Sequence, residues 1–227
     1  MPSLTEAVAV SLPGALAGAT DYCVEPPGLD VARVGGTKYP DLDRVRAAAP
    51  DLVLANAEEN RREDVEALRA DGIPVWVTYP RTLDDALVSL GRLMAALGAA
   101  DPPWLVDART SWSAPFVGVR RSAVVPVWRR PWVVVGSDTF AGDMLARLGV
   151  DNVYASSPER YPRPSLLELR AAGADLVVLP DEPYAFTDAD GPEAFPGLPY
   201  ALVSGRHLTW YGPSLATARA QLTAALG

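Results

Sequence analysis

Continuous apolar runs alternate with stretches of helical spacing along most of this chain. Runs rich in Val, Leu and Ile predict strands over residues 52–55, 74–78, 123–127, 132–135, 175–179 and 200–203. Between and after them, apolar residues recur at helical intervals, which predicts helices over 63–70, 139–148, 166–172 and 214–226. Alternating strands and helices are typical of an α/β fold with parallel sheets covered by helices.

The middle of the chain has a different pattern. A long helix is predicted over 82–97, with Thr82 as its cap, Asp84 and Asp85 in its first turn and leucines along one face. A second helical stretch, 103–112, follows a Pro-Pro pair. We therefore expect an N-terminal α/β lobe over 1–80, a rigid helical linker over 81–113 and a C-terminal α/β lobe over 114–227, with a ligand cleft between the lobes. The N-terminal lobe opens on a helix at Ser3, so either it lacks a first strand or the sequence starts late.

One segment occurs twice, once in each predicted lobe. Residues 46–58 read RAAAPDLVLANAE and residues 170–182 read RAAGADLVVLPDE, and seven of the thirteen positions are identical. Each copy has the pattern of a helix end, a turn, a hydrophobic strand and an acidic loop. Chance similarity between two ordinary helix–strand units is the alternative to duplication. Duplication predicts two similar lobes.

Composition excludes several classes of function. The net charge of −8 argues against a nucleic-acid partner, because phosphates need a basic surface. With 49% hydrophobic and 21% charged residues the chain is a globular protein. No apolar run approaches the roughly 18 residues of a membrane span, and no signal peptide is visible, so the sequence as written predicts a cytoplasmic protein. The single cysteine, Cys23, is expected to be a packed thiol.

Aromatic residues are frequent in the loops predicted to follow the strands. Ligands of open parallel sheets bind beyond the carboxyl ends of the strands, and aromatic side chains there offer flat apolar surfaces. We expect four of these residues to face a ligand: Tyr22, Trp128, Tyr184 and Trp210. Trp132 and Phe140 are expected in the core.

Catalytic motifs are scarce. The sequence has no G-x-S-x-G elbow, Walker loop, G-x-G-x-x-G, C-x-x-C or H-E-x-x-H, so a zinc site or a catalytic cofactor is not expected. A two-lobed α/β enzyme acting on a small substrate stays open as the alternative, with Glu58, Asp181 and His207 as its candidate acids and bases.

Several short motifs, taken in order, resemble a known family. They are PSLTE at 2–6, TDYC at 20–23, VGGTK at 34–38, PDLVL at 50–54, GIPV at 72–75, DTF at 138–140, DEPY at 181–184 and WYG at 210–212. Their order and spacing resemble the cobalamin-binding, helical-backbone metal receptor group of ABC-transporter substrate-binding proteins. The resemblance covers nearly the whole chain.

The resemblance implies two Rossmann-like lobes joined by a rigid helix, and a corrinoid or another metal chelate, such as a ferric siderophore, held between them without catalysis. It implies a monomer outside the cytoplasm that delivers its ligand to an ABC permease. The ligand-binding residues that it implies, together with the loop aromatics, are Tyr22, Asn56, Trp128, Tyr161, Asp181, Tyr184 and Trp210. The permease-docking acids are Asp43 and Glu168, the latter beside Leu167 at the matching position. Two aromatic positions of the family are Thr37 and Asn56 here, so the fold carries over better than the choice of ligand.

Overall fold

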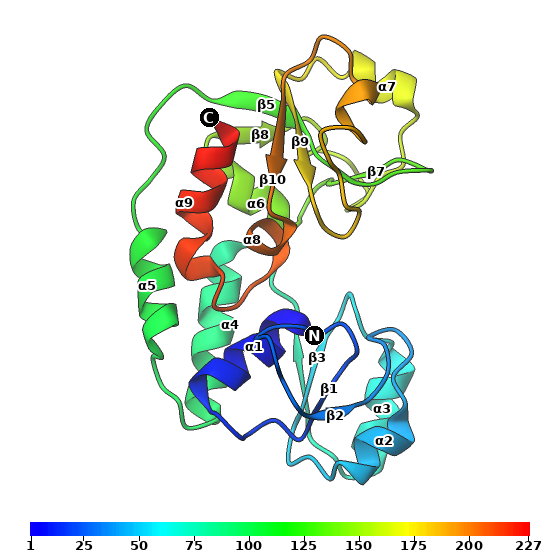
Figure 1. The fold of residues 1–227 in the computed structure, drawn as a ribbon, viewed down its shortest axis with the longest axis vertical. Helices are drawn as coiled ribbons and strands as arrows, with labels where there is room; N and C mark the ends of the chain where they lie inside the picture. Colours follow the sequence, from blue (N-terminus) through cyan, green and yellow to red (C-terminus); the bar gives the residue numbers. More distant parts are fainter. The chain divides into compact units, whose positions relative to one another are not determined.

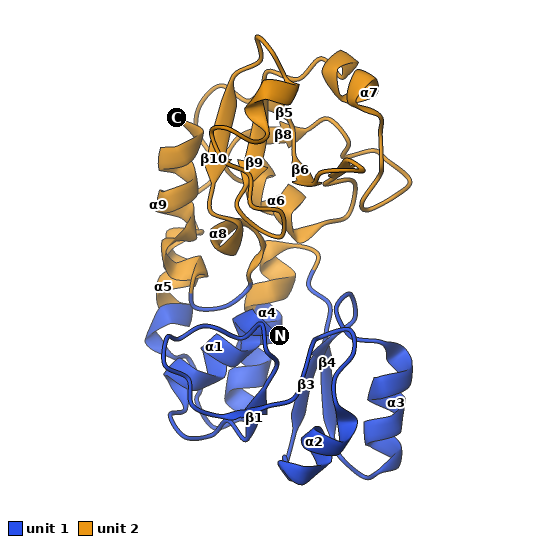
Figure 2. Cartoon of the chain, turned by 45° about the vertical axis from the view of Figure 1, so that its right-hand side comes forward, with its two compact units in different colours: residues 1–80, 88–105, 211–213 blue, residues 81–87, 106–210, 214–227 orange.

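The computed structural model describes residues 1–227, which divide into two compact units (Figure 2). Unit 1 comprises residues 1–80, 88–105 and 211–213, and unit 2 comprises residues 81–87, 106–210 and 214–227. No helix is both long and apolar enough to cross a membrane. The predicted fold class, α/β with parallel sheets, is confirmed in each unit.

Unit 1 begins with a helix and has its strands in two separate pairs (Figure 1). Its elements up to residue 80 are α1 Pro2–Ser11, β1 Gly18–Ala19, β2 Ala32–Arg33, α2 Leu42–Ala47, β3 Val53–Asn56, α3 Arg62–Ala70 and β4 Val75–Thr78. Strand β1 pairs in parallel with β2, and β3 pairs in parallel with β4, but the two pairs are not joined. A small core of Val34, Val45 and Leu68 packs with side chains of β3 and β4.

Local chemistry explains where the helices of unit 1 begin and end. The Asp41 carboxylate accepts hydrogen bonds from the backbone N–H groups of Asp43 and Arg44, both at 3.1 Å, and so caps α2. Helix α3 ends at Ala70 and is followed by Asp71 and Gly72, and the Gly72 φ of +81° is a conformation that glycine adopts without steric cost. The chain then turns directly into β4.

Unit 2 contains one continuous parallel sheet with the strand order β10-β9-β5-β8. An antiparallel pair, β6-β7, extends from it. The elements are β5 Arg121–Val124, β6 Pro126–Trp128, β7 Val133–Val134, α6 Phe140–Ala146, β8 Val150–Asn152, α7 Leu166–Ala171, β9 Leu176–Pro180, the 3-10 turn Pro192–Ala194, β10 Tyr200–Val203, α8 Gly205–Thr209 and α9 Leu215–Leu226. All five residues of β9 are buried, as expected for a central strand covered on both faces.

Two strand predictions need correction in detail. The run 123–127 is not one strand, because the chain leaves the sheet at Val125 and β6 starts at Pro126, which has no N–H for a ladder. The run 132–135 forms the short β7, antiparallel to β6 and outside the parallel sheet. The other predicted strands match β3, β4, β9 and β10 within one or two residues.

The predicted long helix is α4, Leu83–Ala96, and α5, Pro103–Ser111, follows it. Both helices are divided between the units: residues 81–87 belong to unit 2 and residues 88–105 to unit 1. The start of α4 is fixed within unit 2, where the Leu83 N–H donates to the Asp143 carboxylate at 2.8 Å and Arg147 pairs with Asp84 at 2.9 Å. The domain boundaries expected from the sequence, with a separate linker over 81–113, stay a prediction.

The two copies of the repeated segment adopt the same elements. Helix α2 and strand β3 carry the first copy, and helix α7 and strand β9 carry the second. The caps also correspond, since Asp41 precedes α2 as Ser165 precedes α7. A helix followed by a strand that pairs in parallel with the next strand is thus built twice.

Candidate functional site

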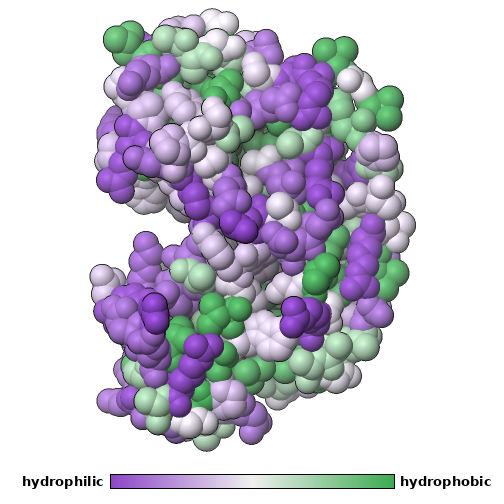
Figure 3. Space-filling view, turned by 180° about the vertical axis from the view of Figure 1, so that it is seen from behind, coloured by the Kyte–Doolittle hydropathy of each residue, from purple (hydrophilic) through white to green (hydrophobic).

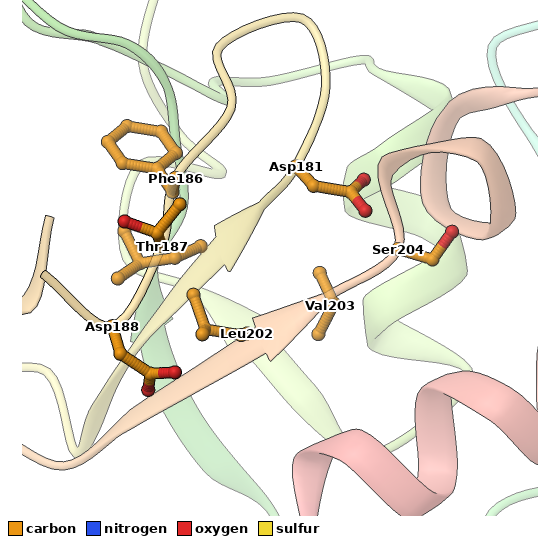
Figure 4. Close-up of a pocket in the computed structure, with 8 residues that line it drawn as sticks. Asp181, Phe186, Thr187, Asp188, Leu202, Val203 and Ser204 are labelled. Atoms are coloured by element: carbon orange, nitrogen blue, oxygen red, sulfur yellow. The ribbon is translucent and has the colours of Figure 1, made fainter. Parts of the chain in front are cut away.

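The carboxyl ends of β9 and β10 form a polar corner in unit 2 (Figure 4). Asp181 directly follows β9, and its carboxylate accepts a hydrogen bond at 2.6 Å from the N–H of Gly205, which opens α8 after β10. A Cβ at Gly205 would lie 2.7 Å from the backbone N of Glu182, so glycine is what allows this approach. A pocket of about 380 Å³ lies beside it, lined by Asp181, Phe186, Thr187, Asp188 and Ser204 among others.

Aromatic rings gather next to this corner. Trp128, at the end of β6, packs edge-on against Tyr184 with ring centroids 5.7 Å apart, and Tyr184 lies 4.6 Å from Phe186. Phe186 stacks on Trp132 at 6.2 Å. Phe186 is buried, whereas Trp128 remains 45% exposed and Tyr184 is half-buried. The aromatic cluster therefore extends from the buried core at Phe186 to the protein surface at Trp128.

A half-buried arginine organises the outer part of the cluster. Arg129, whose side chain is 12% exposed, forms ion pairs with Asp190 and Glu193. Asp190 also accepts a hydrogen bond at 2.5 Å from the hydroxyl of Tyr184. The guanidinium lies 5.3 Å from the Trp132 ring centroid, within cation–π range. The Tyr184 ring is thus held by its hydroxyl as well as by packing.

Trp210 is fixed by an acid rather than left free. Its indole N–H donates to the Glu182 carboxylate at 2.9 Å, and the Arg206 guanidinium lies 5.6 Å from its ring centroid. Burial raises the pKa of Glu182, and the indole hydrogen bond opposes that rise, as does the Arg206 charge, while Asp181 adds to it. Trp210 is half-buried and presents only part of its ring.

In unit 2 the candidate acids and bases Asp181 and His207 have separate hydrogen-bond partners. Asp181 and His207 lie in unit 2 and Glu58 in unit 1. The Asp181 carboxylate holds Gly205, and the nearest recorded partner of His207 Nε2 is the Thr217 hydroxyl at 3.3 Å. Nowhere in residues 1–227 do three or more His, Cys, Asp or Glu side chains group as a metal site.

In unit 1 the matching loop is tied together by Asn56. This residue is 3% exposed; its side-chain oxygen accepts from the N–H groups of Glu58 at 2.7 Å and Glu59 at 3.2 Å, and its amide donates to the Tyr211 hydroxyl at 2.5 Å. The Tyr211 hydroxyl also lies 3.3 Å from Thr78 Oγ1 at the end of β4. The Asn56 side chain is therefore engaged within the protein, and its role as a ligand contact stays a prediction.

Tyr22, unlike the buried Asn56, is exposed to solvent. It is 66% exposed in the loop after β1, and its ring lies beside Gly36, where an added Cβ would be 3.6 Å from it. The neighbouring Cys23 is fully buried, with its sulfur 3.1 Å from the hydroxyls of both Thr5 and Thr20, which agrees with the expected packed thiol. The loop is thus anchored by Cys23 and exposes Tyr22.

The remaining predicted residues, one aromatic and two acids, lie on other segments of the two units. Tyr161 is 44% exposed with Arg160 at 6.0 Å from its ring centroid. Asp43 is exposed in the first turn of α2 and pairs with Arg46 at 2.7 Å. Glu168 completes a capping box with Ser165 at the start of α7, and the Ser165 hydroxyl and N–H lower its pKa. The docking role of both acids stays a prediction.

Two residues that organise the site are not among the site residues predicted from the sequence. They are Tyr211, which bonds to Asn56, and Arg129, which pairs with Asp190 and Glu193. Tyr211 is buried, and burial raises its pKa well above the usual range. The signal that could have identified Tyr211 is the WYG motif at 210–212, in which Trp210 is half-buried and Tyr211 is buried.

Comparison with known proteins places the fold. No protein-family model matches the chain. It is 24% identical over 188 residues to the vitamin B12-binding protein of Photorhabdus laumondii, an alignment that spans 78% of this chain and 68% of that protein. The periplasmic heme-binding protein RhuT from Roseiflexus sp. RS-1 superposes with a TM-score of 0.82 at 19% identity, covering 99% of this chain and 94% of that one. The periplasmic vitamin B12-binding protein BtuF of Vibrio cholerae gives 0.78 at 17% identity, covering 100% and 94%.

These comparisons confirm the resemblance found in the sequence. The chain has the α/β fold of these periplasmic binding proteins. The similar proteins are described as binding proteins for vitamin B12 or heme.

Proposed function

We propose that this protein binds a planar metal chelate of the corrinoid or heme type and delivers it to an ABC importer. The observation that carries the proposal is the set of exposed aromatic rings at the carboxyl ends of strands in each unit, above all Tyr22 in unit 1 and Trp128 in unit 2. A tetrapyrrole is a large flat apolar ring, and such rings bind by packing against aromatic faces. The similar proteins of known ligand bind vitamin B12 or heme, which supports the same ligand class here.

The proposed contacts come from both units. We infer that Tyr22 of unit 1 and four aromatic residues of unit 2, Trp128, Tyr161, Tyr184 and Trp210, contact the ligand. Asp181 and Asn56 would hold the loops in place rather than provide the main contact area, because their polar groups are already hydrogen-bonded. The chelate is cargo, and no resident cofactor is needed.

Titration of the full chain with cyanocobalamin, hemin and a ferric siderophore tests this proposal. Tryptophan fluorescence should be quenched with saturation at micromolar concentration by at least one of them, because Trp128 and Trp210 flank the proposed site. Absence of saturable quenching with all three would overturn the proposal.

A matched pair of tyrosines gives the control. Tyr161 and Tyr200 are 44% and 45% exposed, but Tyr200 opens β10 at its amino end, and its hydroxyl donates to Asp188 at 3.0 Å. Tyr161→Ala should weaken binding by about 1–2 kcal/mol, the value of an aromatic contact, while Tyr200→Ala should leave affinity unchanged. Equal losses in both variants would place the ligand elsewhere.

We propose that Asp43 and Glu168 dock a permease, with the protein acting as an extracytoplasmic monomer. Asp43 is exposed at 93% of its side chain, and Glu168 lies one residue after the exposed Leu167 at the start of α7. Asp43→Asn should reduce capture by the cognate permease without changing chelate affinity, whereas Asp30→Asn, on an exposed loop of the same unit, should not. Unchanged capture by the Asp43 variant would refute the docking role.

A further inference from the structure

An arginine at the end of β2 holds the loop that precedes this strand. Residues 20–31 connect β1 to β2 without forming a helix or a strand (Figure 1). The half-buried Arg33 donates from Nη1 to the carbonyl oxygen of Thr20 at 3.0 Å and to that of Cys23 at 2.8 Å. Its Nη2 atom donates to the carbonyl oxygen of Leu29 at 3.1 Å. One side chain therefore joins the two ends of the loop.

The guanidinium group suits this arrangement. Its N–H donors project from a rigid plane in several directions, whereas a lysine ammonium offers its donors at a single point. Hydrogen bonds from an ionised donor are roughly twice as strong as those between neutral groups. The three carbonyl contacts should therefore restrict the loop more than a neutral side chain could.

Arg33 differs in its partners from other arginines of unit 1. Hydrophilic side chains lie among apolar ones on the face of unit 1 in the lower part of Figure 3. Four arginines of this unit pair with carboxylates: Arg44, Arg46, Arg61 and Arg62. The Arg33 guanidinium instead donates to backbone carbonyl oxygens of its own loop. Its hydrogen-bonding capacity is thus directed into the loop and not toward a neighbouring acid.

The backbone on both sides of Tyr22 is fixed by hydrogen bonds. On one side the Asp21 N–H donates to the Gly35 carbonyl oxygen at 2.9 Å. On the other side the Cys23 carbonyl oxygen accepts from Arg33. The Tyr22 ring itself is largely exposed, so its place depends on this backbone more than on packing.

Cys23 is a second anchor of the same loop. It is fully buried, and its sulfur lies 3.1 Å from the hydroxyls of both Thr5 and Thr20. A thiol is a weak donor and a weak acceptor, and these contacts lie at one end of the loop. Arg33 also reaches Leu29 at the other end. The buried thiol therefore fixes one point, whereas the arginine fixes the span.

We propose that Arg33 is a positioning residue for the ligand, because it holds residues 20–29 in one conformation and thereby sets the place of the Tyr22 ring. Arg33 acts through the loop and not by touching the ligand, since both terminal nitrogens of its guanidinium donate to the loop. This role rests on the proposed function, in which Tyr22 contacts the chelate. A loop that is already ordered loses less conformational freedom on binding, so a loosened loop should bind more weakly even with Tyr22 retained.

The variant Arg33→Met tests this role, because methionine has a similar reach without any donor. In the ligand-free full chain, amide exchange at residues 21–24 should accelerate by about tenfold, while exchange at 53–56 in β3 should not change. Affinity for cyanocobalamin or hemin, whichever binds the unsubstituted chain more tightly, should fall by about tenfold. The matched control is Arg69→Met, since Arg69 also donates to a backbone carbonyl of unit 1, that of Val75 at 3.0 Å. It should leave the affinity and the exchange at 21–24 unchanged.

Two further variants separate positioning from direct contact. In the Tyr22→Ala background, Arg33→Met should weaken binding by less than about twofold, because the ring that it positions is gone. Arg33→Lys keeps the charge but cannot reach all three carbonyls from one point. It should recover only part of the affinity and part of the exchange protection.

Unchanged exchange at residues 21–24 in Arg33→Met would overturn the positioning role, as would faster exchange with unchanged affinity. Losses that add in the Tyr22→Ala background would show that Arg33 contacts the ligand directly and would also overturn it. If Arg33→Met accelerates exchange at 53–56 as well, Arg33→Lys replaces it in the comparison, and full recovery with lysine would refute the role. Binding of neither probe by the unsubstituted chain would refute the proposed function and the role of Arg33 together, whereas tight binding that every Arg33 variant retains would refute the role of Arg33 alone.

Discussion

The two copies of the repeated segment lie in different surroundings, so strand β3 of unit 1 can be compared directly with strand β9 of unit 2. In unit 2 strand β9 has a neighbour on each edge, and all of its residues are buried. In unit 1 strand β3 has one neighbour, and Val53 and Leu54 remain partly exposed. Leu52 and Leu176 occupy the same place in the two copies, yet only Leu176 is buried, at 2% exposure. Burial of a strand is thus decided by what lies beside it as much as by its own sequence.

The loops that follow these strands differ in a second way. After β3 the Asn56 side chain binds its own loop and the buried Tyr211. After β9 the Asp181 carboxylate reaches across to the end of β10. Unit 1 therefore holds its loop by a buried amide, and unit 2 by an exposed carboxylate. The aromatic cluster around Tyr184 occurs only in the second.

Truncation of the two matched leucines gives the largest expected contrast. Leu176→Ala should lower the free energy of unfolding by about 2–5 kcal/mol, because it leaves a cavity beside a strand that cannot collapse. Leu52→Ala should cost about half as much or less, since Leu52 is already partly solvated and lines a cavity of unit 1. Urea unfolding followed with amide exchange in each unit measures both values. Equal costs would contradict the contrast between the two strands.

Substitution of the residues that hold the loops, Asn56 and Asp181, has the second-largest expected effect on stability. Asn56→Ala should cost about 2–3 kcal/mol, because it removes the hydrogen bonds that the buried Asn56 side chain makes with the N–H groups of Glu58 and Glu59 and with the Tyr211 hydroxyl. Asp181→Ala should cost about 1 kcal/mol, since it removes one hydrogen bond, from the Gly205 N–H to the carboxylate of an exposed residue. Tyr211→Phe is the control for the shared hydrogen bond, and combining it with Asn56→Ala should give less than the sum. Additive losses would show that the two side chains act independently.

The sequence predicts the regular elements of this fold well where the pattern is long or fully apolar. Strand β9 and helix α4 lie within one residue of their predicted bounds, since a continuous Leu-Val run and a row of spaced leucines are unambiguous. Strands β1 and β2 have two residues each, too few to show any period, and β8 has three. These strands are defined by their partners and not by their own residues.

The candidate site is harder to predict for the same reason. Exposed aromatics such as Tyr22 and Trp128 can be recognised, because loop positions between strong elements are visible in the sequence. The burial of Asn56 could not be predicted, since its partner Tyr211 lies 155 positions away. A polar residue after a strand is usually solvated, and only the tertiary contact makes this one internal.

The matched helix caps allow a finer comparison of the two copies. Ser165→Ala should cost about 1–2 kcal/mol and Asp41→Ala about 1 kcal/mol, the former more because the capping box also uses Glu168 at 2.7 Å. Ser165→Thr and Asp41→Asn keep an acceptor at the cap and should restore most of each loss. Urea midpoints report the differences. A threonine variant as unstable as the alanine variant would show that the Ser165 hydroxyl does not cap α7.

The smallest expected effect is a pH dependence confined to unit 2. His207 is the only histidine in the chain, and burial lowers its pKa; the Arg206 charge adds to this, and Asp181 opposes it. Its Nδ1 atom is buried without a hydrogen-bond partner, which also disfavours the protonated ring. The folded state therefore binds this proton less readily than the unfolded state, whose histidine pKa is about 6.5. The folding stability is highest above that value and falls as the pH is lowered through it toward the folded pKa.

Amide exchange in unit 2 should accelerate between about pH 7 and pH 5.5, while exchange in unit 1, corrected for intrinsic rates, should not change. His207→Gln should remove the dependence, and a ring-proton titration in the intact chain should give a midpoint below that of a free histidine. A midpoint at or above the free value would mean that the imidazole is solvated in the folded protein.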